Sequence, residues 1–224
     1  EAPGQQPGGE QPEPEPEPIG ETFTLTEGSD YVASELPAEE ERSEDVTYEQ
    51  ATGKNDTVEA SIYGFMDDEE STLNADDQID GGSGTDTLEA SLSDDFDGFS
   101  DSGGMSSVEN VTLTNATGDD EVEFSAAGVE GAEKYDLDAA EGGIALTELA
   151  EAGIGVETNQ QDGNLSLSFA SGATEAEENA LDLTLNEVGE YDDSEAAEHT
   201  ALGLDLTDAQ GSDDNGITDL GVSA

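Results

Sequence analysis

The chain has 224 residues, of which 59 are Asp or Glu and only 3 are Lys or Arg, so its formal net charge at pH 7 is -56. Such a charge repels nucleic acid and anionic lipid, which excludes both as expected partners. Hydrophobic residues make up 32% of the chain, aromatic residues make up 5%, and Cys and Trp are absent, so we expect a thin core without disulfides.

Two explanations of the charge remain open, and they are compatible. Clustered carboxylates can bind divalent cations, and a surface rich in carboxylates and poor in Lys also stays hydrated in a halophilic habitat. The charge alone does not separate these explanations.

Residues 1–20 contain six of the seven prolines, alternating with Glu in "PEPEPEP". This composition favours an extended, solvated linker, and we expect it to separate this region from another domain upstream. Residues 21–105 form an expected N-terminal β region, with alternating strand patterns at 21–32 and 54–66. Between them, residues 35–50 are dense in charge and rich in Glu, and we expect an acidic insert there with a short surface helix or a loop.

From residue 106 to 224, short runs with apolar residues at every second position recur, and each ends at or near a glycine. Val111 would share a buried face with Leu113, and Leu165 with Leu167. Asp162-Gly163 is the one Asp-Gly pair between two convincing runs, and the other connections are uneven in length. We therefore predict an all-β fold, a parallel β-helix or β-roll-like solenoid with acidic Gly/Asp turns, and keep a β-sandwich as the alternative.

The segment "GGSGTDTLE" at 81–89 matches every position of the nonapeptide G-G-x-G-x-D-x-U-x of calcium-binding parallel β-rolls. Its glycines permit a tight turn with inward carbonyls, Asp86 supplies a carboxylate, and Leu88 begins a buried strand. Hard oxygen ligands in such a turn suit Ca²⁺. Three aspartates just before the glycines can complete the site: Asp76, Asp77 and Asp80.

The competing interpretation is a solvated turn that is acidic only because the whole surface is acidic. In β-rolls the nonapeptide repeats in tandem, whereas here a full match occurs once. The acidic turns at 117–121 and 211–216 do not repeat the glycine pattern. The motif therefore predicts a calcium site without excluding the simpler explanation.

Four segments in chain order, at 22–30, 71–92, 105–131 and 163–189, resemble the strand-rich region of bacterial surface-layer and related RTX-type secreted proteins. The similarity covers roughly residues 21–224. It implies a calcium-binding parallel β-solenoid, exported by type I secretion and assembled at the cell surface. The ligands that it implies are Asp77, Asp80, Gly82, Gly84 and Asp86.

The residues argue against an enzyme. His199 is the single histidine, and the chain has no Cys nucleophile, no phosphate-binding Gly-Lys-Ser/Thr loop and no dinucleotide-binding fingerprint. Pairs of carboxylates carry no information in a chain with 59 acids.

We therefore expect a structural, extracellular protein at the cell surface that associates with copies of itself in a layer, sheet or filament. Ca²⁺ is its expected cofactor, and cell-surface glycans are further candidate partners. The alternative is a calcium-dependent adhesin or binding module of a larger type I-secreted protein. We expect no nucleic acid partner and no membrane insertion.

Overall fold

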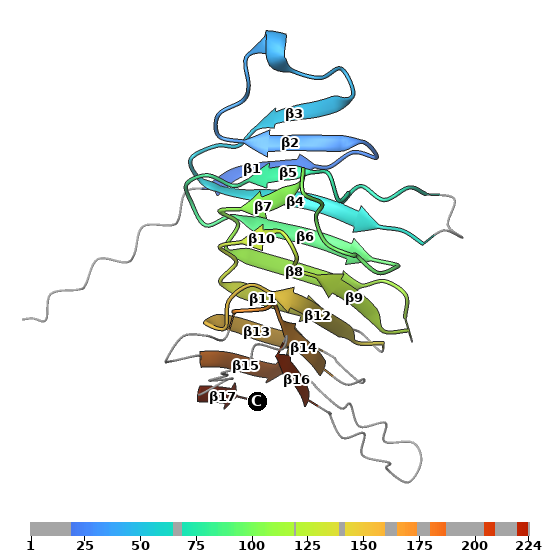
Figure 1. The fold of residues 1–224 in the computed structure, drawn as a ribbon, viewed down its shortest axis with the longest axis vertical. Helices are drawn as coiled ribbons and strands as arrows, with labels where there is room; N and C mark the ends of the chain where they lie inside the picture. The colour runs from blue at the N-terminus through green and yellow to red at the C-terminus, as the bar shows by residue number, and fades with distance from the viewer. Residues whose placement is uncertain are drawn as a thin grey trace, which may run out of the picture.

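The computed structural model describes residues 19–64, 69–118, 120–138, 142–159, 165–173, 180–186, 204–208 and 219–223. Within these residues the chain forms three β-sheets in which all paired strands are parallel, and none of the residues lies in an α-helix. Figure 1 shows the strands stacked along the long axis of the molecule, with β3 near one end and β17 at the other. The all-β prediction is confirmed.

The largest sheet, sheet A, has eight strands whose order in space is also their order in the chain. Its strands are β1 (Ile19–Thr24), β4 (Asn55–Ile62), β6 (Thr87–Leu92), β8 (Asn110–Asn115), β11 (Lys134–Asp138), β13 (Ile154–Asn159), β15 (Ala180–Asn186) and β17 (Asp219–Ser223). Sheet A runs without a break across residue 105, where the sequence suggested a boundary between two regions, because β6 pairs directly with β8.

Two smaller sheets form the other side of the fold. Sheet B has the order β10-β7-β5-β2-β3, and sheet C has the order β16-β14-β12-β9. Sheet B consists of β2 (Ser29–Ala33), β3 (Val46–Gln50), β5 (Gln78–Asp80), β7 (Gly104–Ser106) and β10 (Val129–Glu130). Sheet C consists of β9 (Val122–Ser125), β12 (Ile144–Leu149), β14 (Leu165–Phe169) and β16 (Leu204–Asp208). After each strand of sheet A except β17, the chain passes through sheet B or C before it returns to sheet A.

The core lies between sheet A and the other two sheets, because alternate side chains of each strand point inward. One inward column of sheet A is apolar along its described length. It consists of Phe23, Val58, Leu88, Val111, Tyr135, Val156 and Leu183, all buried and paired in register. Burial of one such side chain contributes roughly 1.5–3 kcal/mol.

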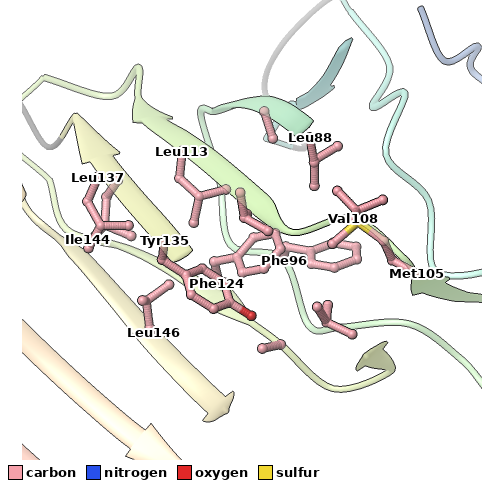
Figure 2. Packing of buried hydrophobic residues seen from close by; sticks show 14 of the residues in the cluster. Leu88, Phe96, Met105, Val108, Leu113, Phe124, Tyr135, Leu137, Ile144 and Leu146 are labelled. Atoms are coloured by element: carbon pink, nitrogen blue, oxygen red, sulfur yellow. The ribbon is translucent and has the colours of Figure 1, made fainter. Parts of the chain in front are cut away.

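Three phenylalanines, Phe96, Phe99 and Phe124, form an aromatic cluster in the core, and Figure 2 shows Phe96 beside Phe124. Phe96 stacks on Phe124 with ring centroids 5.2 Å apart and meets Phe99 edge to face at the same distance. Phe96 also forms an isolated parallel bridge with Phe124 beyond the edge of sheet C. Three of the five phenylalanines among the described residues thus contact one another at one place in the core.

The chain takes a different number of residues for each circuit. Residues in equivalent places near the N-terminal ends of the strands of sheet A are separated by 35 residues from Glu21 to Asp56, by 30 from Asp56 to Asp86 and by 23 from Asp86 to Glu109. This unequal spacing explains why the sequence shows recurring strands without a regular repeat.

Two local expectations need correction. The acidic insert at 35–50 contains a short 3₁₀ helix, Glu39–Glu41, but its last residues form strand β3, because Val46, Thr47 and Tyr48 favour extended backbone. Strand β1 begins at Ile19, inside the predicted linker, and residues 1–18 lie outside the described part. Asp162-Gly163 also lies outside the described residues, and the strands before and after it, β13 and β14, belong to different sheets.

Candidate calcium site

The glycine-rich turn predicted from the sequence lies between β5 of sheet B and β6 of sheet A. Gly82 and Gly84 have φ angles of +86° and +140°, in the left-handed region that favours glycine. Gly81 does not have a positive φ angle, but a Cβ there would lie 2.6 Å from Asp86 Oδ2 and even closer to the Ser107 carbonyl oxygen. The glycines are therefore needed for the path of the backbone, whether or not an ion binds.

Asp86 is 2% exposed and connects three successive circuits of the chain. Its Oδ1 accepts a hydrogen bond from the backbone N–H of Asp56 at 2.7 Å, and its own N–H donates to Glu109 Oε2 at 2.8 Å. Asp56 in turn accepts the N–H of Glu21 at 2.8 Å. We call Asp56, Asp86 and Glu109 the acid column, because they stand in the same register at the N-terminal ends of the neighbouring strands β4, β6 and β8.

The second oxygen of the Asp86 carboxylate has no partner. Oδ2 is fully buried and makes no hydrogen bond. Burial raises the pKa of Asp86, the hydrogen bond from Asp56 lowers it, and the charges of Asp56, Glu109 and Asp80 raise it further. A buried carboxylate oxygen among three other carboxylates is costly unless a proton or a cation neutralises it.

The other carboxylates of this cluster are partly engaged. Asp56 accepts the backbone N–H and the hydroxyl of Thr52, both at 2.6 Å, through its two oxygens. Asp80, at the end of β5, accepts the N–H of Gly82 at 3.1 Å through Oδ1. Asp80 and Glu109 thus use one oxygen each in these hydrogen bonds, whereas both oxygens of Asp56 are used.

A second acidic group lies at the start of β2 and β5. Asp77 is 0% exposed, and its Oδ1 and Oδ2 accept the backbone N–H groups of Asp30 and Asn74 at 2.8 and 2.7 Å. Burial raises the pKa of Asp77 to about 6, although both hydrogen bonds oppose the shift. Asp30 is also buried, and its Oδ2 accepts the N–H of Thr26 at 2.8 Å. Both carboxylates of this pair therefore act as caps for backbone turns.

Asp76 belongs to the same region but faces solvent. Its Oδ1 accepts the hydroxyls of Ser100 and Ser102 at 2.6 and 2.9 Å, and these hydrogen bonds, that of Ser100 first, lower the pKa of Asp76. Asp76 thus ties the turn before β5 to the turn before β7.

The structure divides the predicted ligands between the two ends of β5. Asp80 and Asp86 lie near each other with the turn glycines Gly82 and Gly84, whereas Asp76 and Asp77 lie with Asp30. Three residues of extended strand separate the Cα atoms of Asp77 and Asp80 by roughly 10 Å and turn their side chains to opposite faces, and both oxygens of Asp77 are already engaged by backbone N–H groups. Of the two groups, the one around Asp86 contains the unpartnered oxygen.

Sequence reasoning missed three acids that the fold brings to these groups: Asp30, Asp56 and Glu109. Asp30 and Asp56 each follow a Thr by four residues, in "TEGSD" and "TGKND", a spacing that places a carboxylate over the start of a turn. That shared pattern was the available signal. Glu109 has none, because its place in the acid column depends on the pairing of β6 with β8.

Carboxylate and carbonyl oxygens are the ligands that Ca²⁺ prefers. In the part of the chain that the structure describes, no three Asp, Glu or His side chains already converge tightly enough to hold a metal ion. An ion at Asp86 would therefore require the surrounding carboxylates to close on it.

Comparison with family models, with curated proteins and with solved structures finds no match to this chain. Among the described residues there is no helix of the length and apolar character needed to cross a membrane.

Proposed function

We propose that the chain is a structural protein of the cell exterior, a calcium-stabilised β-solenoid whose copies assemble into a surface layer, sheet or filament. The observation that carries the proposal is the parallel sheet A, whose first and last strands each have an edge that pairs with no other described strand. The resemblance to surface-layer and RTX-type proteins, stated from the sequence, supports the same assignment.

The solenoid assignment is supported by the alternation of the chain between sheet A and sheets B and C. A β-sandwich is built from antiparallel strands with hairpin and Greek-key connections. All strand pairs of the described residues are parallel instead, and sheet A gains one strand with each circuit. A solenoid combines these two features.

Assembly is supported by the edges of sheet A. Among the described strands, β1 pairs only with β4, and β17 pairs only with β15. Each edge presents unpaired backbone N–H and C=O groups, to which another strand can add. Because the two edges belong to opposite ends of one parallel sheet, addition of one copy to the next is head-to-tail, and it extends into a filament when the rotation between copies does not close a ring.

Calcium binding is supported by the unpartnered Asp86 Oδ2. Asp80, Asp86 and Glu109 would hold the ion, with help from carbonyl oxygens of the turn at 81–84. The ion would supply positive charge to a cluster that contains acids and no base. Asp56 would stay a turn cap, since both of its oxygens already accept hydrogen bonds.

Electron microscopy of the purified chain tests assembly. We expect sheets or filaments in millimolar Ca²⁺ and their loss in chelator. Particles that remain monomeric at all calcium and salt concentrations would contradict the proposal.

Thermal unfolding in chelator, in Ca²⁺ and in Mg²⁺ at matched ionic strength tests whether bound Ca²⁺ stabilises the fold. At a hundred times its dissociation constant, one bound Ca²⁺ adds about 2.7 kcal/mol to the free energy of unfolding. We expect this gain to vanish in the double variant Asp80→Ala/Asp86→Ala. The control Asp97→Ala/Asp101→Ala removes two exposed acids outside the cluster and should keep the gain. An equal gain with Mg²⁺ would mean that the turn is only solvated.

The alternative, an adhesin or binding module, is favoured by one observation: a groove on the outer face of sheet B.

A further inference from the structure

The outer face of sheet B is hollowed into a groove with a volume of about 510 Å³. It extends over β2, β5, β7 and β10, which lie side by side in Figure 1. Its lining includes Tyr31, Gln78, Asp80, Ser106 and Glu130, with Gly104 among them. The volume is within the range of about 300–1,000 Å³ that is usual for binding sites of small molecules.

An aromatic ring stands at one end of the groove. The described phenylalanines are all buried, so three tyrosines are the partly exposed aromatic residues of this part of the chain: Tyr31, Tyr48 and Tyr63. Two of them are neighbours, since Tyr31 pairs with Tyr48 across β2 and β3, with ring centroids 5.6 Å apart. Two of the three partly exposed aromatic rings among the described residues therefore lie at or beside this groove.

The Tyr31 ring is held in place from behind. The Tyr48 hydroxyl accepts the backbone N–H of Ser43 at 3.0 Å, and the Arg42 guanidinium lies over the Tyr48 ring, 5.3 Å from its centroid. The Tyr31 ring packs against the Tyr48 ring, which these two contacts hold in place. A ring that is ordered before binding loses little conformational entropy when a ligand stacks on it.

The floor and wall of the groove follow from the strand register. Tyr31 pairs with Gln78, and Gln78 pairs with Gly104, so a bare stretch of backbone adjoins the tyrosine ring and the amide. The next outward column contains Asp80, Ser106 and Glu130, which also pair in register. The groove therefore has the Tyr31 ring at one side and the polar groups of Gln78, Asp80, Ser106 and Glu130 near it. At Gly104, between them, no side chain fills the groove.

We propose that this groove binds a neutral oligosaccharide. The apolar C–H face of a pyranose ring stacks on an aromatic ring, while carboxylates, amides and hydroxyls form hydrogen bonds with its hydroxyl groups. Asp80, Glu130 and Glu35 line the groove and no Lys or Arg does, so uronic acids, sulfated glycans and nucleic acid are repelled. A polycation would be attracted to the acidic surface in general and would not need the ordered Tyr31 ring.

Glycan binding in the groove does not depend on calcium binding or self-assembly. The variants are therefore chosen to change the groove without changing the candidate calcium site. Asp80 belongs to both sites, so it stays unchanged. The test uses Tyr31→Ala, which removes the ring, Tyr31→Phe, which keeps it, and Gln78→Ala, which removes the amide. Tyr63→Ala is the control, because it removes a partly exposed tyrosine that does not line the groove.

The measurement is titration calorimetry and ligand-observed NMR of the whole chain in Ca²⁺, with tetrasaccharides of glucose in α- and β-linkage, of N-acetylglucosamine and of mannose as probes. We expect at least one probe to bind, Tyr31→Ala and Gln78→Ala to weaken it at least tenfold, and Tyr31→Phe and Tyr63→Ala to retain it. All variants should unfold and assemble as the wild type does.

Absence of binding by all four probes at 10 mM would overturn the proposal. Binding that Tyr31→Ala leaves unchanged would also overturn it, because the glycan would then lie elsewhere. A groove that binds spermine or a Lys-rich peptide in a Tyr31-dependent way, and no glycan, would identify a cationic ligand instead. Loss of assembly in Tyr31→Ala and Tyr31→Phe alike would make the groove a contact between copies.

Discussion

The backbone N–H of Asp56 donates to Asp86 Oδ1, so a carboxylate just before β6 fixes the backbone at the start of the neighbouring strand β4. Glu109 holds Asp86 in the same way. These bonds satisfy backbone groups at the corners, where the sheet ladder ends and a buried N–H without a partner would be costly. They also gather carboxylates around Asp86 Oδ2, where a structural role and a cation site coincide.

Replacement of Asp86 by Asn should act in opposite directions without and with calcium. Asp86→Asn removes a buried charge whose Oδ2 has no partner, while the amide oxygen can still accept the Asp56 N–H. In chelator at pH 7 we expect the variant to be more stable than wild type by about 1 kcal/mol. In saturating Ca²⁺ it should be less stable, because the ion-dependent gain is lost. Urea denaturation in the two buffers measures both changes.

Asp77→Asn is the matched control for this substitution. Both oxygens of Asp77 accept backbone N–H groups, so an amide NH₂ would face a donor on one side. We expect a loss of about 1–3 kcal/mol in both buffers. Asp86→Asn should instead stabilise the chain in chelator. If it destabilises the chain there, the negative charge at Asp86 Oδ2 is already compensated in the folded state.

The buried aspartates should make the chain more stable in mild acid when no divalent cation is present. The pKa of Asp77 is raised to about 6, above its value in the unfolded chain, so the folded state binds the proton more tightly. The free energy of unfolding should therefore rise as the pH falls from 7 through 6 and level off near the unfolded pKa of about 4, with at most about 3 kcal/mol from this group. Burial raises the pKa of Asp30 and Asp86 in the same direction.

Urea denaturation at pH 7, 6, 5 and 4 in chelator measures this dependence. Exposed carboxylates also lose charge at low pH, so the specific readout is the slope between pH 7 and 5, which Asp77→Asn should reduce. Stability that falls between pH 7 and 5 would contradict the assignment.

The strand pattern was predictable because local sequence determines it. Leu165, Leu167 and Phe169 alternate with Ser, and all three are buried in β14 as expected. Val46 to Gln50 was missed because its acidic neighbours favoured a helix, while its pairing with β2 decided for a strand. The β propensity of Val46, Thr47 and Tyr48 and the pairing with β2 together outweigh the acidic neighbours.

The candidate site was predictable only in part. Asp86 and the glycines of the turn lie in one short segment, so a single sequence motif predicts them together. Asp56 and Glu109 meet Asp86 through strand register, across intervals of 30 and 23 residues, and no local pattern specifies such intervals. Tyr31 and Gln78 likewise meet only because β2 pairs with β5.

A proline at Thr24 should block assembly without disturbing the fold. Leu25 donates its N–H to Glu59 of β4, and Glu21 donates toward the same neighbouring strand. Since N–H groups alternate in direction along a strand, that of Thr24 points to the open edge of β1. Thr24→Pro removes an edge donor and keeps the pairing with β4.

Thr24→Val is the control for this variant, because it also loses the hydroxyl bond to Glu59 but keeps the backbone N–H. We expect Thr24→Pro to form no sheets or filaments in Ca²⁺ and Thr24→Val to form them. Thermal unfolding of both should stay close to that of wild type. Normal assembly of Thr24→Pro would show that copies do not join through the edge of β1.

The outer face of sheet A has two pairs of neighbouring acids, one with a lysine beside it and one without. Removal of an acid from the pair without a lysine should stabilise the fold, and removal of the lysine from the other pair should destabilise it. Glu59 pairs in register with Glu89, both exposed, with no base beside them among the described residues. In the same column, Asp136 pairs with Glu157, and Lys134 Nζ contacts their carboxylates at 3.1 and 2.6 Å. Like charges on adjacent strands about 4.8 Å apart destabilise a sheet, and a cation between them relieves this.

Glu89→Gln should therefore raise the free energy of unfolding at low salt by about 0.2–1 kcal/mol, and Lys134→Gln should lower it by a similar amount. Both effects should shrink in 1 M KCl, where the screening length is about 3 Å. Urea denaturation is the appropriate measurement, because urea is uncharged and leaves the ionic strength unchanged. A chain whose stability is the same in low salt and in 1 M KCl, with Glu89→Gln neutral in both, would show that repulsion on this face is already neutralised. Bound cations would then have to be sought along sheet A as well as at Asp86.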